Sequence, residues 1–439
     1  MKAFRRFKPY PAYKDSGVEW LGKIPAHWEV KRLKRVFRVV NGSTPSSAAP
    51  ACWDGEIPWV TPEDLGDLKG MTITSTRRTI TESGYWSCGT TLVPSGSLVL
   101  STRAPIGHLA MAGVDLCTNQ GCRSLVFRDA DSREFFYYEL LAARPELESF
   151  GQGSTFRELA KGMLEDLEIS IAPEPEQRTI AAFLDRETAR IDALVAKKER
   201  LIELLQEKRT ALITRTVTKG LYPTVPMKDS GVEWLGEIPA HWEVKRIKAV
   251  ARLHTGGTPA GVHDEAFDQE GVPWVKPDHL RGDCGISIPD RHLSTKAAMS
   301  VGPVRAGSVL VCGIGTVGKV GHAPVEVCTN QQINAISFDS NVIDRYGHFI
   351  TFCLQQEFSR RANKVTIPIC NKSEMGEALL CIPPLDEQRT IAAFLDRETA
   401  RIDALVAKVR EAVDRLKELR TAVISAAVTG KIDVREEVA

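Results

Sequence analysis

The polar side chains best suited to recognise another molecule are amides and hydroxyls that occur twice in the same order. They are Thr44, Asn119 and Gln120 in the first part of the chain, and Thr258, Asn330 and Gln331 in the second. Asn and Gln side chains can form paired hydrogen bonds with the edge of adenine, so these residues could contact bases. Asparagine also stabilises turns through its own side chain, and that interpretation stays open.

Two short basic runs form a second repeated feature. Lys31 and Arg32 alternate with apolar residues, and Lys245 and Arg246 do so later in the chain. Such alternation predicts a half-buried element with one charged face. Because the runs repeat, they suit sequence-independent contact with phosphates. A solvated structural face explains them equally well.

Three other cations lie in turns that differ between the two parts of the chain. Arg103 aligns with Ile314, Lys276 follows Trp274, and Lys319 ends a glycine-rich turn. Arginine can bond to a guanine edge, and lysine can meet phosphates or base edges. Surface turns without a ligand are the alternative for each residue.

The glycine-rich segment Gly313–Gly318 (GIGTVG), followed by Lys319, has the spacing of a nucleotide-binding loop. Such loops require a helix directly afterwards, so that its N-terminus meets the phosphates. The next residues, Val320–Val325 (VGHAPV), do not predict a helix, and Val320 occupies the position that needs a hydroxyl for magnesium. The segment therefore predicts a β-turn. We find no catalytic constellation and no metal-ligand cluster, so catalytic and metal-binding residues are predicted to be absent.

A duplication supplies the elements that must position these side chains. Residues 14–34 and 228–248 differ only at Lys23/Glu237 and Leu33/Ile247, and residues 176–197 are identical to 387–408. Between these segments, short β-branched runs broken by Gly, Pro and Asn predict strands and turns. The fold is therefore predicted to be α+β, with tandem halves that each contain a strand-rich mixed module followed by a long helix.

The two long helices are predicted from apolar residues at three- and four-residue spacing that no Gly or Pro interrupts before Gly220 or Gly430. A run of roughly forty residues spans about 60 Å. Lys198 and Arg209 fall in seam-like positions, so the heptad pattern is imperfect. We favour an antiparallel helix pair between two modules over ordinary core helices of one large domain. The predicted domains are 1–172, 173–221, 222–383 and 384–439.

Bulk composition places the chain among globular proteins. Its apolar fraction is 43%, its charged fraction is 26%, and its formal net charge is +1. No segment has the length and purity of a membrane-spanning helix or the apolar run of a signal peptide, so a cytoplasmic location is expected. The ten scattered cysteines form no CxxC pair and suggest reduced, buried thiols.

These motifs carry a family resemblance. Both halves contain, in the same order, KDSGVEWLG, IPAHWEV, a turn ending in Thr-Pro, a Pro-Trp-Val strand, a Thr-Asn-Gln segment and EQRTIAAFLDRETARIDALVAK. The whole chain resembles the specificity subunit of type I restriction–modification enzymes. The resemblance implies two target-recognition domains alternating with two long helices that pair as an antiparallel coiled coil.

The resemblance also implies a function and a set of partners. Each recognition domain would read one half of a split, asymmetric target in double-stranded DNA, in a role in phage defence. The helices would set the spacing and dock two methylation subunits, and restriction subunits would complete the complex. S-adenosylmethionine, ATP and magnesium would lie in those partners, so this chain is expected to bind no cofactor and to have no catalytic activity of its own.

The pattern of divergence supports two modules with a related task. Segments that are identical in both halves suit one job done twice, whereas a shared scaffold with different side chains suits the same job on different targets. Three alternatives stay open: a self-contained enzyme, a structural adaptor that binds no DNA, and an inactive orphan specificity protein.

Overall fold

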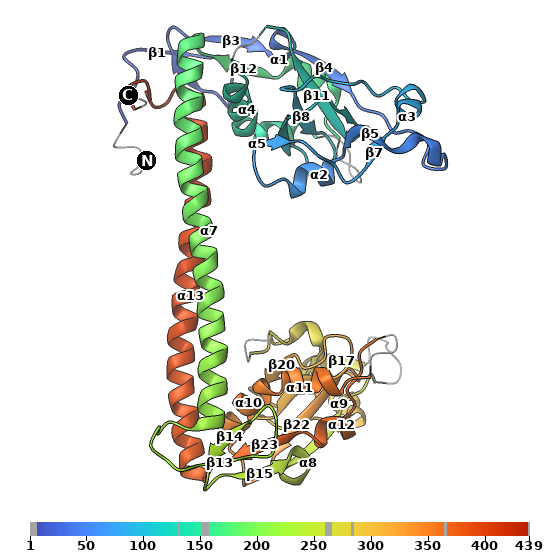
Figure 1. Cartoon of the computed structure of the whole chain (residues 1–439), viewed down its shortest axis with the longest axis vertical. Helices are drawn as coiled ribbons and strands as arrows, with labels where there is room; N and C mark the ends of the chain where they lie inside the picture. The colour runs from blue at the N-terminus through green and yellow to red at the C-terminus, as the bar shows by residue number, and fades with distance from the viewer. Residues whose placement is uncertain are drawn as a thin grey trace. The chain divides into compact units, whose positions relative to one another are not determined.

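The computed structural model describes residues 7–129, 132–151, 158–259, 266–281, 285–363 and 367–437. Two compact units divide the chain, one formed by residues 1–198 with 411–439 and the other by residues 199–410. Each unit combines one strand-rich module with one end of each long helix (Figure 1). The predicted α+β class and the tandem halves are confirmed.

The first module contains mixed sheets. Its largest sheet has the order β4 (Phe37–Asn41), β11 (Cys122–Phe127), β8 (Leu98–Ser101), β9 (Leu109–Ala112) and β6 (Thr72–Ile73). A second sheet has the order β10 (Cys117–Thr118), β5 (Trp53–Val60) and β7 (Thr79–Ile80). Two antiparallel pairs complete it: β1 (Tyr13–Asp15) with β2 (Lys23–Pro25), and β3 (Glu29–Arg32) with β12 (Glu168–Ile171).

The second module repeats this plan. Its main sheet has the order β16 (Ala251–Thr255), β22 (Ile333–Phe338), β19 (Val309–Cys312) and β20 (Val320–His322). The smaller sheet has the order β18 (His292–Leu293), β17 (Phe267–Val275) and β21 (Cys328–Thr329). The antiparallel pairs are β13 (Met227–Asp229) with β14 (Glu237–Pro239), and β15 (Glu243–Arg246) with β23 (Leu379–Ile382).

Short helices cover the sheets. In the first module they are α1 (Leu33–Val36), η2 (Pro50–Cys52), α2 (Pro62–Asp67), α3 (Glu82–Trp86), α4 (Arg133–Ala142), α5 (Arg144–Ser149) and α6 (Lys161–Asp166). In the second they are α8 (Ile247–Val250), η4 (Pro277–His279), α9 (Thr295–Val301), α10 (Asp344–Cys353), α11 (Gln355–Arg361) and α12 (Lys372–Gly376). Caps fix several starts: the Thr61 and Asn371 side chains accept hydrogen bonds from the backbone of Asp64 and Glu374.

The two long helices are α7 (Glu174–Lys219) and α13 (Leu385–Val428). In the first unit the start of α7 packs against the end of α13, and in the second unit the end of α7 packs against the start of α13, so the helices run antiparallel. Equivalent ion pairs join them: Arg420 Nε lies 2.9 Å from Asp192 in the first unit. Arg209 Nε lies 3.0 Å from Asp403 in the second. Arg209, which the heptad pattern places between the two helices, is thus paired with a carboxylate of the other helix.

The nearly identical segments anchor each module to a helix start. Trp28 is fully buried, and its indole N–H donates to Glu176 in the first turn of α7 at 3.0 Å, while His27 Nε2 lies 2.8 Å from the same carboxylate. In the second unit Trp242 and His241 contact Glu387 of α13 at 3.1 and 2.9 Å. These aromatic residues are therefore packing anchors, which explains why both segments hardly differ.

The far ends of the helices return to the same anchors. Helix α7 ends directly before Gly220, and α13 ends two residues before Gly430; both glycines have positive φ, which glycine adopts readily as a helix terminator. A side chain at Gly430 would meet Pro25 and Trp28, and one at Gly220 would meet Trp242 and Glu387. Each anchor therefore touches the start of one long helix and the end of the other.

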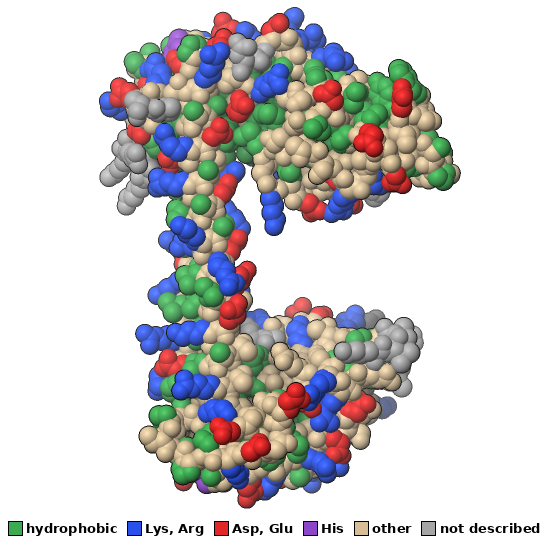
Figure 2. Space-filling view, viewed as in Figure 1, with side chains coloured by type: hydrophobic (Ala, Val, Ile, Leu, Met, Phe, Trp, Pro, Cys, Tyr) green, Lys and Arg blue, Asp and Glu red, His purple; other side chains and the backbone are tan. Residues whose placement is uncertain are grey.

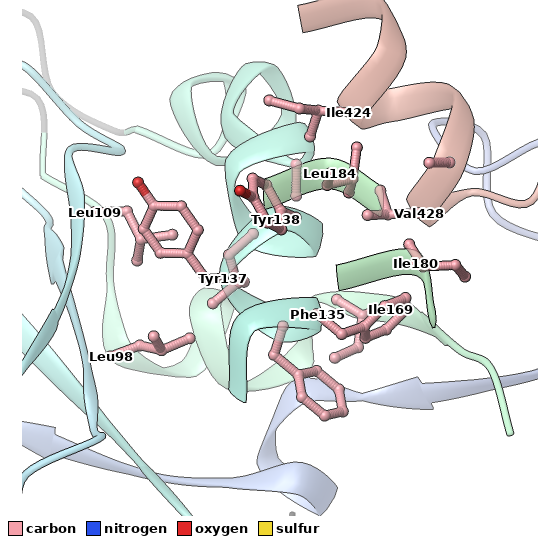
Figure 3. Close-up of a cluster of buried hydrophobic side chains, with 14 of the residues drawn as sticks. Leu98, Leu109, Phe135, Tyr137, Tyr138, Ile169, Ile180, Leu184, Ile424 and Val428 are labelled. Atoms are coloured by element: carbon pink, nitrogen blue, oxygen red, sulfur yellow. The ribbon is translucent and has the colours of Figure 1, made fainter. Parts of the chain in front are cut away.

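One hydrophobic core joins the first module to both helices (Figure 3). It combines Leu98 and Leu109 of the main sheet with residues of α4 and β12, and it continues into both long helices. The labelled members are Leu98, Leu109, Phe135, Tyr137, Tyr138, Ile169, Ile180, Leu184, Ile424 and Val428. The second unit has an equivalent core that includes Ile213, Val217, Ile391 and Leu395 of the helices. Each module is thus fixed to its end of the helix pair by continuous packing.

Replacing Trp242 by phenylalanine is expected to lower the stability of the second unit by about 1–3 kcal/mol, because Glu387 loses a buried hydrogen-bond donor. Trp28→Phe should have a similar effect on the first unit, since the geometry around Glu176 is the same. Urea unfolding of the full chain measures both. A loss at one position and none at the other would contradict an equivalent role.

Candidate nucleic-acid interface

Two loops of the first module are held together by a set of polar contacts. Antiparallel pairing of β4 with β11, which starts at Asn41↔Arg123, places the loop at residues 118–120 beside the turn at residues 42–45. Ser43 N–H donates to the Thr118 carbonyl at 3.0 Å, and the Trp59 indole N–H donates to the Ser43 carbonyl at 3.0 Å. The Thr44 hydroxyl donates to Oε1 of Gln120. We call this arrangement the first loop clamp.

The second module has the same arrangement, formed by residues 256–259 and 329–331, which we call the second loop clamp. Gly257 N–H donates to the Thr329 carbonyl at 2.8 Å, and the Trp274 indole N–H donates to the Gly257 carbonyl at 3.2 Å. The Thr258 hydroxyl donates to Oε1 of Gln331 at 2.6 Å. The two loop clamps therefore match contact by contact.

Glycine is required where the two loops approach each other. A Cβ atom at Gly42 would lie 2.0 Å from the Asn119 carbonyl oxygen, and one at Gly256 would lie 2.1 Å from the Thr329 carbonyl oxygen. Neither backbone oxygen can move away without breaking the parallel strand pair. The glycine in each turn is thus a consequence of close backbone approach.

The asparagines of the two loop clamps are engaged in their own turns. Asn119 Oδ1 accepts from Gly121 N–H at 2.9 Å, and Asn330 Oδ1 accepts from Gln332 N–H at 3.2 Å. Asn330 is only 6% exposed. The geometry therefore favours the turn-stabilising role for both asparagines, whereas Gln120 and Gln331 are exposed.

The predicted contact residues separate into two groups at opposite ends of a strand. In the first module β4 pairs with β11 from Asn41↔Arg123, near the loop clamp, to Phe37↔Phe127. Lys31 and Arg32 precede α1 and lie beyond the Phe37 end. Five strand residues span about 17 Å, so the structure does not bring this pair together with Thr44 and Gln120.

The second module shows the same separation. Strand β16 pairs with β22 from Thr255↔Asn334, near the second loop clamp, to Ala251↔Phe338. Lys245 and Arg246 lie beyond the Ala251 end, on strand β15. Thr258 and Gln331 lie at the other end, beside the loops that carry Lys276 and Lys319.

Acidic neighbours accompany the basic runs. Lys31 lies 2.8 Å from Glu29, and Arg32 lies 3.5 Å from Asp166. Lys245 lies 2.6 Å from Glu243, and Arg246 lies 3.1 Å from Glu377. These exposed ion pairs suit the structural interpretation of the runs, because each cation already has a partner. Phosphate contact at these four residues stays a prediction.

Side chains around the two loop clamps differ. Arg103 Nε lies 3.2 Å from Glu158, and Arg123 lies 3.6 Å from the same carboxylate. The equivalent bridge in the second module joins Ile314 to Ile369, without charge. There Lys319 Nζ donates to the Pro277 carbonyl at 3.2 Å, and the Lys276 ammonium lies 4.6 Å from the centre of the Trp274 ring. A shared scaffold therefore carries different chemistry in each module.

The glycine-rich segment Gly313–Gly318 forms the turn between β19 and β20. Strand β20 begins at Val320, directly after the turn, so no helix N-terminus follows it. The prediction of a β-turn in place of a phosphate-binding loop is confirmed.

A surface pocket of about 820 Å³ beside the first loop clamp contains residues that the sequence patterns did not single out. Arg77, Arg78 and His108 line it together with Trp59 and Asn119. The Arg78 guanidinium lies 3.5 Å from the centre of the Trp53 ring. Arg291 occupies the equivalent position in the second module, where its guanidinium lies 5.0 Å from the centre of the Phe267 ring, so Arg78 is repeated and Arg77 is not.

Neighbouring charges and burial affect the ionisable side chains that line this pocket. Arg77 forms ion pairs with Glu63 at 2.7 Å and with Asp67. Burial, aided by the nearby Arg144 charge, lowers the pKa of His108, so its imidazole is neutral at pH 7. On the visible faces, Lys and Arg side chains are interspersed with Asp and Glu (Figure 2). Polar recognition here depends on local placement more than on a broad basic surface.

Metal and thiol chemistry have little support in the part of the chain that the structure describes. Those residues contain no group of three His, Cys, Asp or Glu side chains arranged to hold a metal ion. Among the cysteines within the described ranges no disulfide joins two of them, and Cys284 lies outside those ranges. Burial raises the pKa of the Cys117 and Cys328 thiols to about 11, which keeps them protonated. No helix within the described ranges is both long and apolar enough to cross a membrane.

Comparison with known proteins gives consistent results. The chain is 28% identical to the specificity subunit of the type I restriction enzyme MjaIX from Methanocaldococcus jannaschii, and the match covers 98% of this chain and 99% of that protein. It is 21% identical to the EcoBI specificity subunit from Escherichia coli, covering 95% and 89%. A solved structure from work on complex assembly and conformational transition of the type I R-M system shares the fold, with a TM-score of 0.71, 18% identity and coverage of 92% and 98%.

The family model for the type I restriction modification DNA specificity domain matches residues 25–204 and 239–415. The two matched segments coincide with the two halves of the duplication, and each includes one loop clamp and one anchor tryptophan. The chain therefore belongs to the type I restriction modification DNA specificity family and carries two copies of its domain.

Proposed function

We propose that this chain is the DNA sequence-specificity subunit of a type I restriction–modification complex, and that each module reads one half of a split, asymmetric target. The observation that carries the proposal is the pair of equivalent loop clamps surrounded by different side chains. A conserved scaffold with divergent contacts suits two modules that perform one task on two base sequences. The specificity subunits among its relatives support the same assignment.

The proposal gives the chain a non-catalytic role. Two methylation subunits would supply adenine methylation with S-adenosylmethionine, and restriction subunits would supply ATP- and magnesium-dependent cleavage. The chain itself would bind none of these cofactors. Its contribution is to place the partner subunits on a defined DNA sequence in the cytoplasm. Family membership and the matched relatives support this division of labour.

Different side chains near each loop clamp are proposed to discriminate bases. Arg103, Arg77 and Arg78 serve the first module, and Lys276 and Lys319 serve the second. Arginine and lysine donate hydrogen bonds to guanine O6 and N7, and they also meet phosphates. Apart from Arg78, whose equivalent is Arg291, these cations are not repeated, so the two half-sites would differ in sequence.

Mapping N6-methyladenine tests the proposal directly. In a cell that expresses this chain with its neighbouring methylation subunit, we expect a two-part, non-palindromic motif that disappears when the chain is deleted. An uninterrupted palindromic motif would contradict two independent reading modules. Unchanged methylation after deletion would favour an adaptor or an inactive orphan protein.

A further inference from the structure

The loop clamps contain the same exposed group in both modules, although their surroundings differ. Each combines a backbone hydrogen bond between loops, an indole donor, a glycine at the point of closest approach, and a threonine bonded to a glutamine. Arg103 of the first module is charged, whereas the equivalent residue of the second module, Ile314, is not. The repeated glutamine amid this divergence suits a partner that is the same for both modules.

The threonine determines which end of the glutamine amide faces outward. In both loop clamps the Thr hydroxyl donates to Oε1 of the glutamine. The acceptor atom of each amide is therefore turned toward the protein, and the two N–H donors of Nε2 remain for an external partner. Gln120 and Gln331 are both exposed, so these donors are accessible.

The free N–H donors of the two glutamines indicate which kind of group they can bind. Base edges in the major groove present different donor and acceptor patterns, and two modules with different targets meet different patterns. Phosphate oxygens are acceptors at every step of the duplex, whatever the base sequence. A group that is identical in both modules, with its amide oxygen engaged by threonine and its N–H donors free, matches the phosphate better than the bases.

We propose that Gln120 and Gln331 each donate a hydrogen bond to a DNA phosphate and thereby set the register of the modules on their half-sites. Thr44 and Thr258 act as positioning residues, because their hydroxyl protons are used to orient the glutamines. Base discrimination then falls to the divergent side chains beside each loop clamp. This inference rests on the proposed DNA-reading function.

The test compares Gln120→Ala, Gln331→Ala and the corresponding Gln→Glu variants in the full chain. Binding is measured with a duplex that carries the mapped motif and with a duplex of scrambled sequence. Losing one hydrogen bond to a charged phosphate should weaken binding about ten- to hundredfold on both duplexes. Glutamate keeps an oxygen for the threonine but directs negative charge at the phosphate, so its loss should exceed that of alanine, without a fall in melting temperature.

Controls separate this inference from its alternatives. Gln206→Ala, on an exposed face of α7, should leave binding unchanged. A loss confined to the motif duplex would overturn the inference in favour of a base contact. A melting-temperature decrease with unchanged DNA affinity would show that the glutamine only holds the loops together. Failure of the unsubstituted chain to bind either duplex would instead contradict the proposed function.

Discussion

Replacing Glu139 by glutamine is expected to stabilise the protein increasingly as the pH rises from 4 to 8. Glu139 lies in α4 and is fully buried, and its Oε1 accepts from Ser170 N–H at 2.7 Å and from the Ser170 hydroxyl at 2.8 Å. Burial raises the pKa of this carboxyl from its ordinary 4.5 to about 8, although both Ser170 hydrogen bonds oppose the shift. The folded protein therefore keeps the proton at neutral pH.

The sign of the effect follows from the raised pKa. Below pH 4.5 both the folded and the unfolded chain hold the proton, and the contribution of the neutral acid to stability is fully present. As the pH rises toward 8, the unfolded chain releases its proton while the folded chain retains it, so this contribution is lost. Glutamine has no such dependence. Between pH 4 and pH 8 the stability difference should therefore shift in favour of the variant by about 3–5 kcal/mol.

Urea-unfolding midpoints of the full-length parent and the Glu139→Gln variant, measured from pH 4 to pH 9, check this expectation. The exposed Glu82, in the same module, supplies a matched control. Its glutamine variant should differ from the parent by a nearly constant amount across the range. A constant difference for Glu139→Gln would show that the carboxyl is ionised in the folded protein.

Replacing the first module by a second copy of the other module is expected to convert the asymmetric target into a symmetric one. The two helix segments that receive the modules are identical, so Asp185 and Thr188 match Asp396 and Thr399. In the first unit Tyr138 donates to Asp185 at 2.7 Å, and in the second Arg345 bonds to Asp396 at 2.6 Å. The same carboxylate position thus accepts either module.

The boundaries of this exchange follow from the strand pairs. Residues 247–382 should replace residues 33–171, so that β23 accompanies its own module. In the second unit Cys381 donates to the Val217 carbonyl at 3.0 Å, and in the first the Ser170 hydroxyl oxygen lies 2.8 Å from the Val428 carbonyl oxygen. The incoming Cys381 can therefore meet the end of α13 as Ser170 does.

Mapping of N6-methyladenine measures the outcome. We expect the original motif to disappear and a motif with two inverted copies of the second half-site to replace it. A graft of residues 247–377 onto positions 33–166 serves as a control, because it retains Ser170 but places Ile350 where Glu139 stood. That graft leaves the buried Ser170 N–H without an acceptor. It should therefore be less stable than the full exchange by about 1–3 kcal/mol. Survival of the original first half-site in the full exchange would refute modular reading.

The sequence alone determined the features that depend on local pattern and on repetition. The duplication, the α+β class, both long helices and the absence of a phosphate-binding loop at Gly313–Gly318 could be predicted from it. Helical periodicity and helix-terminating glycines are local signals, so α7 ends at Lys219, directly before Gly220. The near-identity of the anchor segments indicated one job done twice, and Trp28 and Trp242 are fully buried in equivalent positions.

Only the tertiary structure decided which candidate contact residues lie together. Lys31 and Arg32 are near Thr44 in sequence, yet β4 separates them, and the acid that pairs with Arg32 is Asp166, far along the chain. Gln120 is distant from Thr44 in sequence, yet antiparallel pairing of β4 with β11, which starts at Asn41↔Arg123, brings them into contact. Strand pairing between remote segments leaves little trace in local periodicity, because it depends on side chains that meet only after folding. The separation of the basic runs from the loop clamps, and the outward direction of the two glutamine amides, are therefore properties of the fold.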